Sequence, residues 1–269
     1  MFPDRKVQID YIEKIVKLQL RYCHYLFKKK KIVFNNAINN YCDIYRKTDL
    51  YSVHPGMQYK QNCFFPGKKV VWNKLVNQMS NLIKEENISD PNKFINKSYD
   101  LLLPRLLARI DKKFNLVEYN KKARFGCFDY DIVNKKINLH MPVFQFRAEE
   151  FTQLRIKEKK SLDKYKFLLD LVKHALKMYP NYKIIQCGIW MNTYTPFKKL
   201  FPSSWQPTGI LKKENSLACW GQFVDINGGI NQKIADKFVE KFIFPYSAEF
   251  YECNISYLKD YLIFQLKDE

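Results

Sequence analysis

Hydrophobic positions in the first part of the chain recur every three or four residues, a spacing that places them on one face of an α-helix. We expect four helices from this pattern, over residues 7–26, 34–45, 71–83 and 91–110. The last of them begins with Asp90 as a cap and Pro91 at the first helical position, where proline is well tolerated. Pro104 lies inside the same helix and is expected to kink it.

From about Leu116 the pattern changes to alternation, which is typical of strands. We expect four strands there, over residues 125–130, 137–141, 184–190 and 217–226. Helices are expected over residues 162–179, 234–242 and 255–266, with Asn254 capping the last. The first two strands read as a hairpin. The pattern therefore predicts an α+β fold, with an N-terminal helical region of about four helices (1–115) followed by a mixed α/β sheet domain (116–269).

The composition is that of a folded protein. Hydrophobic residues make up 46% of the 269 residues, whereas disordered chains combine low hydrophobicity with high net charge. No apolar run reaches the roughly 18 residues of a membrane-spanning helix, and the N-terminal sequence lacks the apolar core of a signal peptide. We therefore expect a cytoplasmic protein with no membrane partner.

The seven cysteines are scattered singly and form no CxxC pair, the spacing that is typical of zinc sites and redox motifs. The motifs HExxH and GxSxG and the protein-kinase signature are also absent. We expect the cysteines to be reduced and structural, and we expect no metal cofactor. Metal-dependent hydrolysis and phosphoryl transfer are disfavoured for the same reason.

Charge is the compositional feature that bears most directly on partners. The chain has 46 Lys and Arg against 27 Asp and Glu, a net charge of +19, which is compatible with nucleic acid or another polyanion as a partner. The alternative is that codon usage in an AT-rich genome raised the lysine content. Lys28–Lys31 has two interpretations of its own. Four cations suit the C-terminal end of a helix, and they also suit contact with phosphates.

His140 is the titratable residue whose position most favours catalysis. It ends a predicted strand two residues before Pro142, and ligands tend to bind at such strand ends. It is either a general base or a buried histidine bonded to backbone. Cys187 lies within an apolar strand, which denies a nucleophile the exposure and the lowered pKa that it needs.

Aromatic and amide side chains gather around the last two predicted strands. If the strands at 184–190 and 217–226 are neighbours, six of these side chains meet near one end of the sheet and form a substrate-binding pocket. They are Trp190, Asn192, Tyr194, Trp205, Trp220 and Gln222. Such residues stack against and orient a ligand, and they fill a plain core equally well.

A glycine-containing turn follows the last predicted strand. Its residues Asn227, Gly228, Gly229 and Asn231 precede a helix, whose N-terminal amides can hold a cofactor phosphate. The turn matches neither GxGxxG nor GxxxxGK[ST]. Its two interpretations are therefore a phosphate site and a simple capped turn.

Two motifs in the second half resemble a known family. Leu139–Pro142 (LHMP) is followed further along the chain by Cys187–Asn192 (CGIWMN). This layout resembles a group of bacterial acyltransferases with a GNAT-like C-terminal domain. In that group a helical region precedes a strand ending in a histidine-proline motif, a helix, and a strand ending in a serine-tryptophan-leucine motif. A leucine-proline loop and a closing strand follow, as do Leu200, Pro202 and Trp220–Phe223 here.

The resemblance covers about 90 residues and departs from the family pattern twice. Ile189 replaces the serine, and the Arg/Gln-x-x-Gly-x-Gly/Ala loop for the coenzyme A pyrophosphate is missing, so that residues 227–231 are the available substitute.

The resemblance implies a GNAT-like sheet whose split edge holds acyl-CoA as co-substrate. It also implies that His140 acts as the base in transfer of the acyl group to an amine of a small molecule or peptide. The alternative is a non-catalytic basic protein that binds nucleic acid through Lys28–Lys31 and Lys157–Lys160. An uncharacterised bacterial family of similar layout is a further alternative, so whether the chain is an enzyme stays open at this point.

Overall fold

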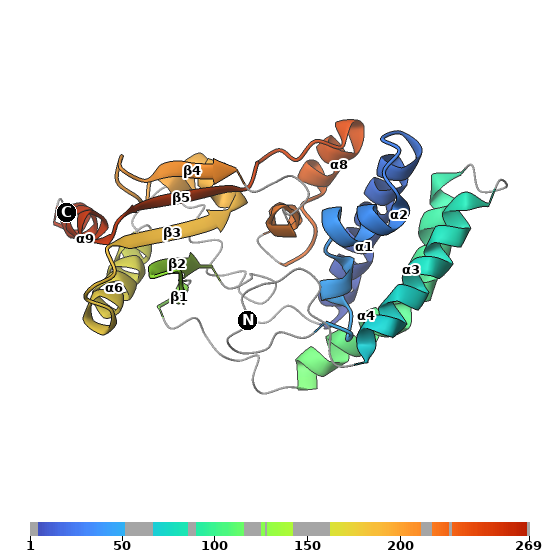
Figure 1. The fold of residues 1–269 in the computed structure, drawn as a ribbon, viewed down its shortest axis with the longest axis horizontal. Coiled ribbons are helices and arrows are strands. Elements are labelled where there is room, and N and C mark those ends of the chain that lie inside the picture. Colours follow the sequence, from blue (N-terminus) through green and yellow to red (C-terminus); the bar gives the residue numbers. More distant parts are fainter. Residues whose placement is uncertain are drawn as a thin grey trace.

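The protein was analysed as a computed structural model, which describes residues 5–51, 67–85, 90–115, 125–126, 128–141, 162–210, 217–225 and 228–267. It has an α+β fold, as the sequence pattern predicts, with the N-terminal helices gathered at one side and a five-stranded mixed sheet, together with the helices that pack on it, at the other (Figure 1). Within the described part of the chain, no helix combines the length and the apolar character needed to cross a bilayer.

Three of the four expected N-terminal helices form as continuous helices. They are α1 (Arg5–Lys28), α3 (Lys68–Lys84) and α4 (Pro91–Asn115). Asp90 caps α4 as expected, because its carboxylate accepts a hydrogen bond of 2.9 Å from the Asn92 backbone N–H. Helix α4 continues through Pro104, which lies on its exposed side.

The expected helix over residues 34–45 is instead divided into three short elements. They are α2 (Phe34–Asn36), the π-helical turn η1 (Ala37–Tyr41) and the 3₁₀ turn η2 (Ile44–Lys47). Asn39 lies at the change of winding, and its side-chain amide donates a hydrogen bond of 2.8 Å to the Asn35 carbonyl. Side-chain bonds of this kind compete with the regular helical ladder.

The helical part has its own core, in which α1 packs against α4 and the η1–η2 segment. A buried polar cluster lies within this core. Gln19 Nε2 donates 2.7 Å to Asp43 Oδ1, and the Asp43 backbone N–H donates 2.7 Å to Gln19 Oε1. Lys47 Nζ lies 3.2 Å from Asp43 Oδ2. Burial is the largest influence on Lys47 and opposes its charged form, but the Asp43 carboxylate and Tyr11 together outweigh burial and raise the pKa of Lys47.

Replacing Asp43 by Ala is expected to lower the free energy of unfolding by about 3–5 kcal/mol, because the buried Lys47 ammonium loses its counter-charge. The double variant Asp43→Asn, Lys47→Met removes both charges and keeps an acceptor for Gln19, so it should recover most of that loss. Urea denaturation followed by tryptophan fluorescence measures both. A double variant as unstable as the single one contradicts this account.

The sheet has five strands in the order β1-β2-β3-β5-β4. The strands are β1 (Asp129–Val133), β2 (Lys136–His140), β3 (Ile184–Ile189), β4 (Gln206–Ile210) and β5 (Glu249–Asn254). Strands β2 and β3 are parallel, and the other neighbours are antiparallel. In the chain, helix α6 (Leu162–Met178) lies between the two parallel strands.

Strands β1 and β2 form the expected hairpin, with the first strand displaced toward the turn relative to the prediction of 125–130. The turn residues Asn134 and Lys135 have φ angles of 51° and 60°. Two consecutive positive φ angles define the type I′ turn, whose twist matches that of the paired strands. The hairpin register therefore places Asp131 opposite Asn138.

The prediction of a strand over 217–226 is wrong. Residues Leu217–Phe223 form the 3₁₀ element η7, followed by a single bridge between Val224 and Ile230. The strands β4 and β5 form where no strand was predicted, and β5 occupies the place beside β3. The spacing of hydrophobic residues alone cannot distinguish a short buried strand from another buried apolar segment of the same length.

Alternation along the strands gives the sheet two different faces. One face packs on α6 and α9 (Ile255–Gln265), and the residues that it buries are Ile137, Leu139, Ile185, Cys187, Tyr251 and Cys253. The other face carries polar, partly exposed side chains. Asn254 caps α9 as expected, accepting hydrogen bonds from the Ser256 and Tyr257 backbone N–H groups.

Two elements of the C-terminal half pack with the helical core. Helix α8 (Gln232–Lys241) lies beside α1 (Figure 1), where Phe238 contacts Tyr22 with ring centroids 5.2 Å apart. Trp220 and Phe223 of η7 belong to the same core. The division of the chain at residue 115 therefore separates segments that are neighbours in space.

Candidate functional site

His140 lies on the polar face of the sheet. Its side chain is 30% exposed, and its Nε2 lies 3.0 Å from Oδ1 of Asp131 on β1. Asn138 Nδ2 donates 2.9 Å to the same carboxylate oxygen and lies 3.1 Å from His140 Nε2. We name these three residues the His140 cluster.

The shared carboxylate oxygen favours one protonation pattern of the imidazole. Asp131 can only accept when it is ionised, and each carboxylate oxygen has lone pairs for two donors. Asn138 supplies one donor, and a proton on His140 Nε2 supplies the other. In neutral imidazole the lone pair is then on Nδ1. A carboxylate orients the imidazole in the same way when histidine acts as a general base.

The His140 cluster lies where β2 and β3 part. The ladder between them consists of the pairs Ile137–Ile185 and Asn138–Gln186, so His140 is two residues beyond the last pair. Strand β3 pairs with β5 over its whole length. The carboxyl ends of parallel strands at such a point are where open sheets tend to bind ligands.

Asp131 and Asn138 were not among the residues selected from the sequence. The signal that identifies them is the two-residue turn at 134–135, which fixes the register and places residue 131 opposite residue 138. Alternation then places His140 on the same face as Asn138. Finding these two residues from the sequence requires the position of the turn to within one residue, because a shift of one residue changes which side chains share a face.

Trp190, Asn192 and Tyr194 lie in or next to η5 (Trp190–Thr193), directly after β3. Asn192 is fully buried, and its Nδ2 donates 2.8 Å to each of the Cys187 and Glu249 carbonyls. The rings of Trp190 and Tyr194 contact the Tyr246 ring, with centroids 5.5 and 5.6 Å apart. These three residues anchor the end of β3 to the segment before β5.

Trp220 and Gln222 lie in η7 and point to different partners. Trp220 lies in the helical core, where its Nε1 donates 2.9 Å to the Tyr41 carbonyl. Gln222 Nε2 donates to the Cys219 and Tyr246 carbonyls at 2.8 and 3.3 Å, and its Oε1 accepts 3.2 Å from the Tyr246 N–H. Both side chains therefore bond to backbone of the protein itself.

Trp205 lies apart from the other two groups. It is 4% exposed and stacks on Phe201 with ring centroids 4.2 Å apart. Four of the six residues predicted to bind substrate therefore lie around the segment 246–249, whereas Trp205 and Trp220 pack elsewhere. The four are Trp190, Asn192, Tyr194 and Gln222. The reason is that residues 217–226, which were expected to bring them together, do not form a strand next to β3.

The predicted phosphate loop is described from Gly228 onward, and Asn227 lies outside the described residues. The Gly229 N–H donates 2.9 Å to Asp225 Oδ1. Asn231 caps α8 by accepting a 3.3 Å hydrogen bond from the Ile234 N–H. The loop therefore presents a carboxylate where a phosphate would have to bind, and its geometry favours a capped turn.

None of the five described cysteines forms a disulfide and all five are buried, as expected for structural thiols, whereas Cys63 and Cys127 lie outside the described residues. Cys187 is 2% exposed, and burial raises the pKa of its thiol to about 12. A thiol of this kind is a poor nucleophile at neutral pH.

Cys187 should react with iodoacetamide only after unfolding. With a pKa of about 12, roughly one thiol in ten thousand is ionised at pH 8, and burial blocks the reagent as well. Mass spectrometry of native and urea-treated protein after a short labelling time measures the difference. Rapid labelling of Cys187 in the native protein contradicts this prediction.

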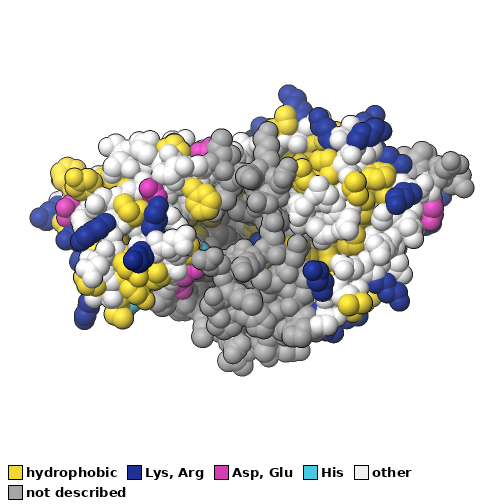
Figure 2. Space-filling model, in the orientation of Figure 1, with side chains coloured by type: hydrophobic (Ala, Val, Ile, Leu, Met, Phe, Trp, Pro, Cys, Tyr) yellow, Lys and Arg dark blue, Asp and Glu magenta, His cyan; other side chains and the backbone are white. Residues whose placement is uncertain are grey.

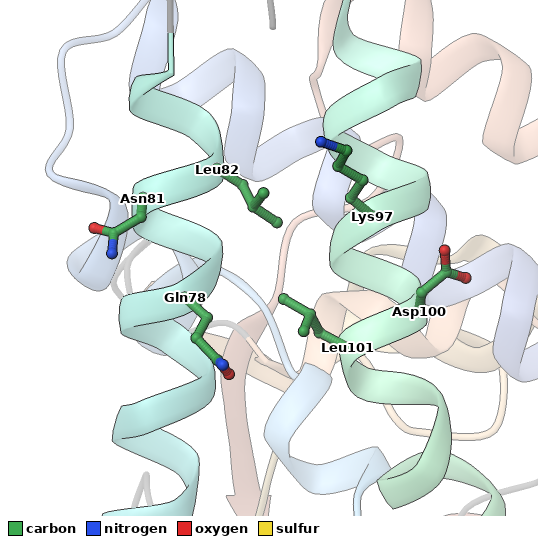
Figure 3. Close-up of a pocket in the computed structure, with 6 residues that line it drawn as sticks. All are labelled: Gln78, Asn81, Leu82, Lys97, Asp100 and Leu101. Carbon is green, nitrogen blue, oxygen red and sulfur yellow. The ribbon is translucent and has the colours of Figure 1, made fainter.

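A surface pocket of about 560 Å³ lies between α3 and α4 (Figure 3). Leu82 and Leu101 point toward each other between the two helices, and Gln78, Asn81, Lys97 and Asp100 complete the lining. The pocket belongs to the helical part, whereas the His140 cluster belongs to the sheet. It therefore adds nothing to the chemistry of His140.

Among the described residues, no group of three or more His, Cys, Asp or Glu could hold a metal ion. No protein-family model matches the chain, and no match was found among curated proteins or solved structures. Functional inference therefore depends on the geometry of the described side chains, with the His140 cluster as the candidate site.

Replacing Gln222 by Met is expected to lower the free energy of unfolding by about 3 kcal/mol, because a buried backbone N–H and two carbonyls lose their partner. The matched control is Gln78→Met on the exposed side of α3, which should change stability by less than about 0.5 kcal/mol. Urea denaturation compares the two variants. Equal stability of the two variants contradicts a structural role for Gln222.

Proposed function

We propose that the protein is an acyltransferase-like enzyme that moves an acyl group from an acyl-CoA thioester to an amine of a small molecule or peptide. The observation that carries the proposal is the His140 cluster, in which Asp131 holds His140 at the end of β2. An oriented, partly exposed histidine is what proton removal from an attacking amine requires.

The arrangement of the strands around His140 supports the same chemistry. Strands β2 and β3 are parallel, and their ladder ends at Asn138 and Gln186. In this proposal the thioester binds at the carboxyl ends of these strands, where His140 lies. Two motifs carry the resemblance to GNAT-like acyltransferases. Leu139 and His140 of the first end β2, and Cys187–Ile189 of the second ends β3.

The proposed reaction forms one bond and breaks one. The amine nitrogen attacks the thioester carbonyl carbon, so a C–N bond forms while the C–S bond breaks. His140 accepts the proton that the nitrogen loses and returns it to the departing thiolate, which leaves as a free thiol. Holding the amine and the thioester in contact supplies much of the rate, because orientation replaces a bimolecular encounter.

The assignment of coenzyme A phosphates to residues 227–231 is not retained in this proposal. The Asp225 carboxylate already occupies the Gly229 amide and would repel a phosphate. Trp190, Asn192 and Gln222 are likewise assigned to the framework, since their polar or aromatic groups pack against the protein itself. The residues proposed to act are His140, with Asp131 and Asn138 positioning it.

Acetyl-CoA or free coenzyme A at millimolar concentration is expected to raise the melting temperature, because a ligand that binds only the folded state stabilises it. Differential scanning fluorimetry measures the shift, with ATP as a control for general attraction of phosphates to a basic protein. The absence of any shift, or a shift no larger than that with ATP, contradicts the proposal.

His140→Gln should lower the rate of acyl transfer by about a hundredfold or more, the usual contribution of a general base. Asp131→Asn should lower the rate less, because the imidazole is still present but less well oriented. The matched control is His174→Gln, since His174 contacts Tyr130 from α6 on the other face of the hairpin. Release of free thiol in the presence of an amine panel measures the rate. Equal rates for His140→Gln and His174→Gln would falsify the role of His140.

A further inference from the structure

The C-terminal ends of α1 and α8 lie together at one end of the molecule (Figure 1). Phe238 and Phe242 of α8 both contact Tyr22 of α1, and Phe242 also stacks on Tyr25 with ring centroids 4.3 Å apart. Contacts therefore advance along both helices in the same direction, so the helices run parallel. Their last turns end side by side.

Lysines concentrate at these two helix ends. Lys29, Lys30 and Lys31 follow α1, and Lys241 ends α8; all four are exposed, and we name them the lysine cluster. Lys30 Nζ lies 5.8 Å from the Tyr25 ring centroid, on the same tyrosine that Phe242 stacks against. Figure 2 shows Lys and Arg side chains gathered over this part of the molecule.

The helix dipoles account for only some of these cations. Lys28 and Lys241 lie in the last turns of their helices, where a cation offsets the negative end of the dipole. The backbone N–H groups of Lys29 and Lys30 still donate to the Tyr25 and Leu26 carbonyls of α1. Lys31 follows them, and the dipole effect falls off beyond the last turn. Among the described residues, no ion pair engages a member of the lysine cluster.

Lys31 also occupies a backbone position that disfavours it. Its φ angle is 56°, in the left-handed region where helices usually end with glycine. A residue with a side chain costs about 1 kcal/mol there. The chain thus keeps a cation at the end of α1 where glycine would give a more stable turn.

Each helix end also exposes an aliphatic side chain two residues after a lysine of the cluster. Val33 follows Lys31 and is 69% exposed, and Ile243 follows Lys241 and is 67% exposed. Exposed aliphatic groups gain no favourable contact with the phosphate backbone of a nucleic acid, whereas a bilayer buries such groups below its headgroups. The combination of lysines with protruding aliphatic side chains therefore favours an anionic bilayer over a nucleic acid as the partner.

We propose that the lysine cluster, with Val33 and Ile243, is a contact surface for an anionic lipid bilayer. The lysines lie against the lipid phosphates and carboxylates, and the two aliphatic side chains enter the boundary between headgroups and acyl chains. The expectation of no membrane partner came from the lack of an apolar run long enough to span a bilayer, and a surface contact needs no such run. This proposal does not depend on acyl transfer.

Co-sedimentation with vesicles tests the contact. The protein should bind phosphatidylcholine vesicles that contain about one-third phosphatidylserine and should not bind pure phosphatidylcholine. The triple variant Lys29→Gln, Lys30→Gln, Lys31→Gln should weaken binding about a hundredfold, at about fivefold per lysine. The matched control changes Lys166, Lys173 and Lys177 of α6 to Gln, the same loss of charge at exposed positions of the sheet part, and should change binding little.

Two further variants separate a bilayer from a nucleic acid. Val33→Ser with Ile243→Ser should weaken vesicle binding several-fold and leave the salt-dependent binding of a single-stranded oligonucleotide unchanged. Lys31→Gly should raise the melting temperature while weakening vesicle binding about fivefold, which separates a binding effect from loss of folding.

Three outcomes overturn the proposal. The first is no binding to phosphatidylserine vesicles, and the second is an α6 triple variant that weakens binding as much as the cluster variant. The third is a Val33, Ile243 double variant that binds vesicles as tightly as the unmodified protein. In that last case the surface is a general polyanion site, and nucleic acid becomes the partner to pursue.

Discussion

The helical part and the sheet part of the molecule are joined through η7, and this joint depends on the backbone conformation of η7. Trp220 reaches into the helical core and bonds the Tyr41 carbonyl, while Gln222, two residues later, holds both backbone groups of Tyr246 before β5. In a 3₁₀ turn with three residues per turn, residues two apart point in directions about 120° apart. In a strand the same two residues would point to one face. The 3₁₀ form therefore lets this segment contact both cores, whereas a strand would not.

This joint also explains why so many large aromatic residues lie close together in the sequence. Phe244 packs against both hydrophobic cores, and Trp190 lies next to Gly221, where an added Cβ would come within 3.2 Å of the indole Nε1. Large rigid rings fill a seam between two cores with little loss of side-chain entropy. A dense group of tryptophans is therefore as typical of a contact between two cores as of a ligand pocket, and in this chain Trp190 and Trp220 lie at that contact.

Much of the fold could be predicted from the sequence, because its long helices and its hairpin have strong local signals. Periodicity indicated α1, α3, α4 and α6, and the caps Asp90 and Asn254 were read correctly from residue type. Local signals failed at η7, at the edge strand β4, at β5 and over residues 34–45, where tertiary packing or an exposed edge decides the conformation. For the candidate site, His140 could be selected from its place at a strand end, but its partner Asp131 depends on a register that only the positions of Asn134 and Lys135 in the turn determine.

The kind of hydrogen bond that each polar group makes separates framework from candidate chemistry. Asn192, Trp220 and Gln222 are buried side chains that bond to backbone groups, so exchanging those bonds for a ligand would leave buried polar groups unsatisfied, at a cost of about 1–3 kcal/mol each. The bonds of the His140 cluster join side chains to one another on a face where His140 is 30% and Asp131 47% exposed. Water can satisfy every group in that cluster if a bond opens, so folding does not require it. A carboxylate and an amide nonetheless converge on one imidazole, beside the point where two parallel strands part. We interpret this convergence as serving the proposed chemistry of the imidazole rather than the stability of the fold.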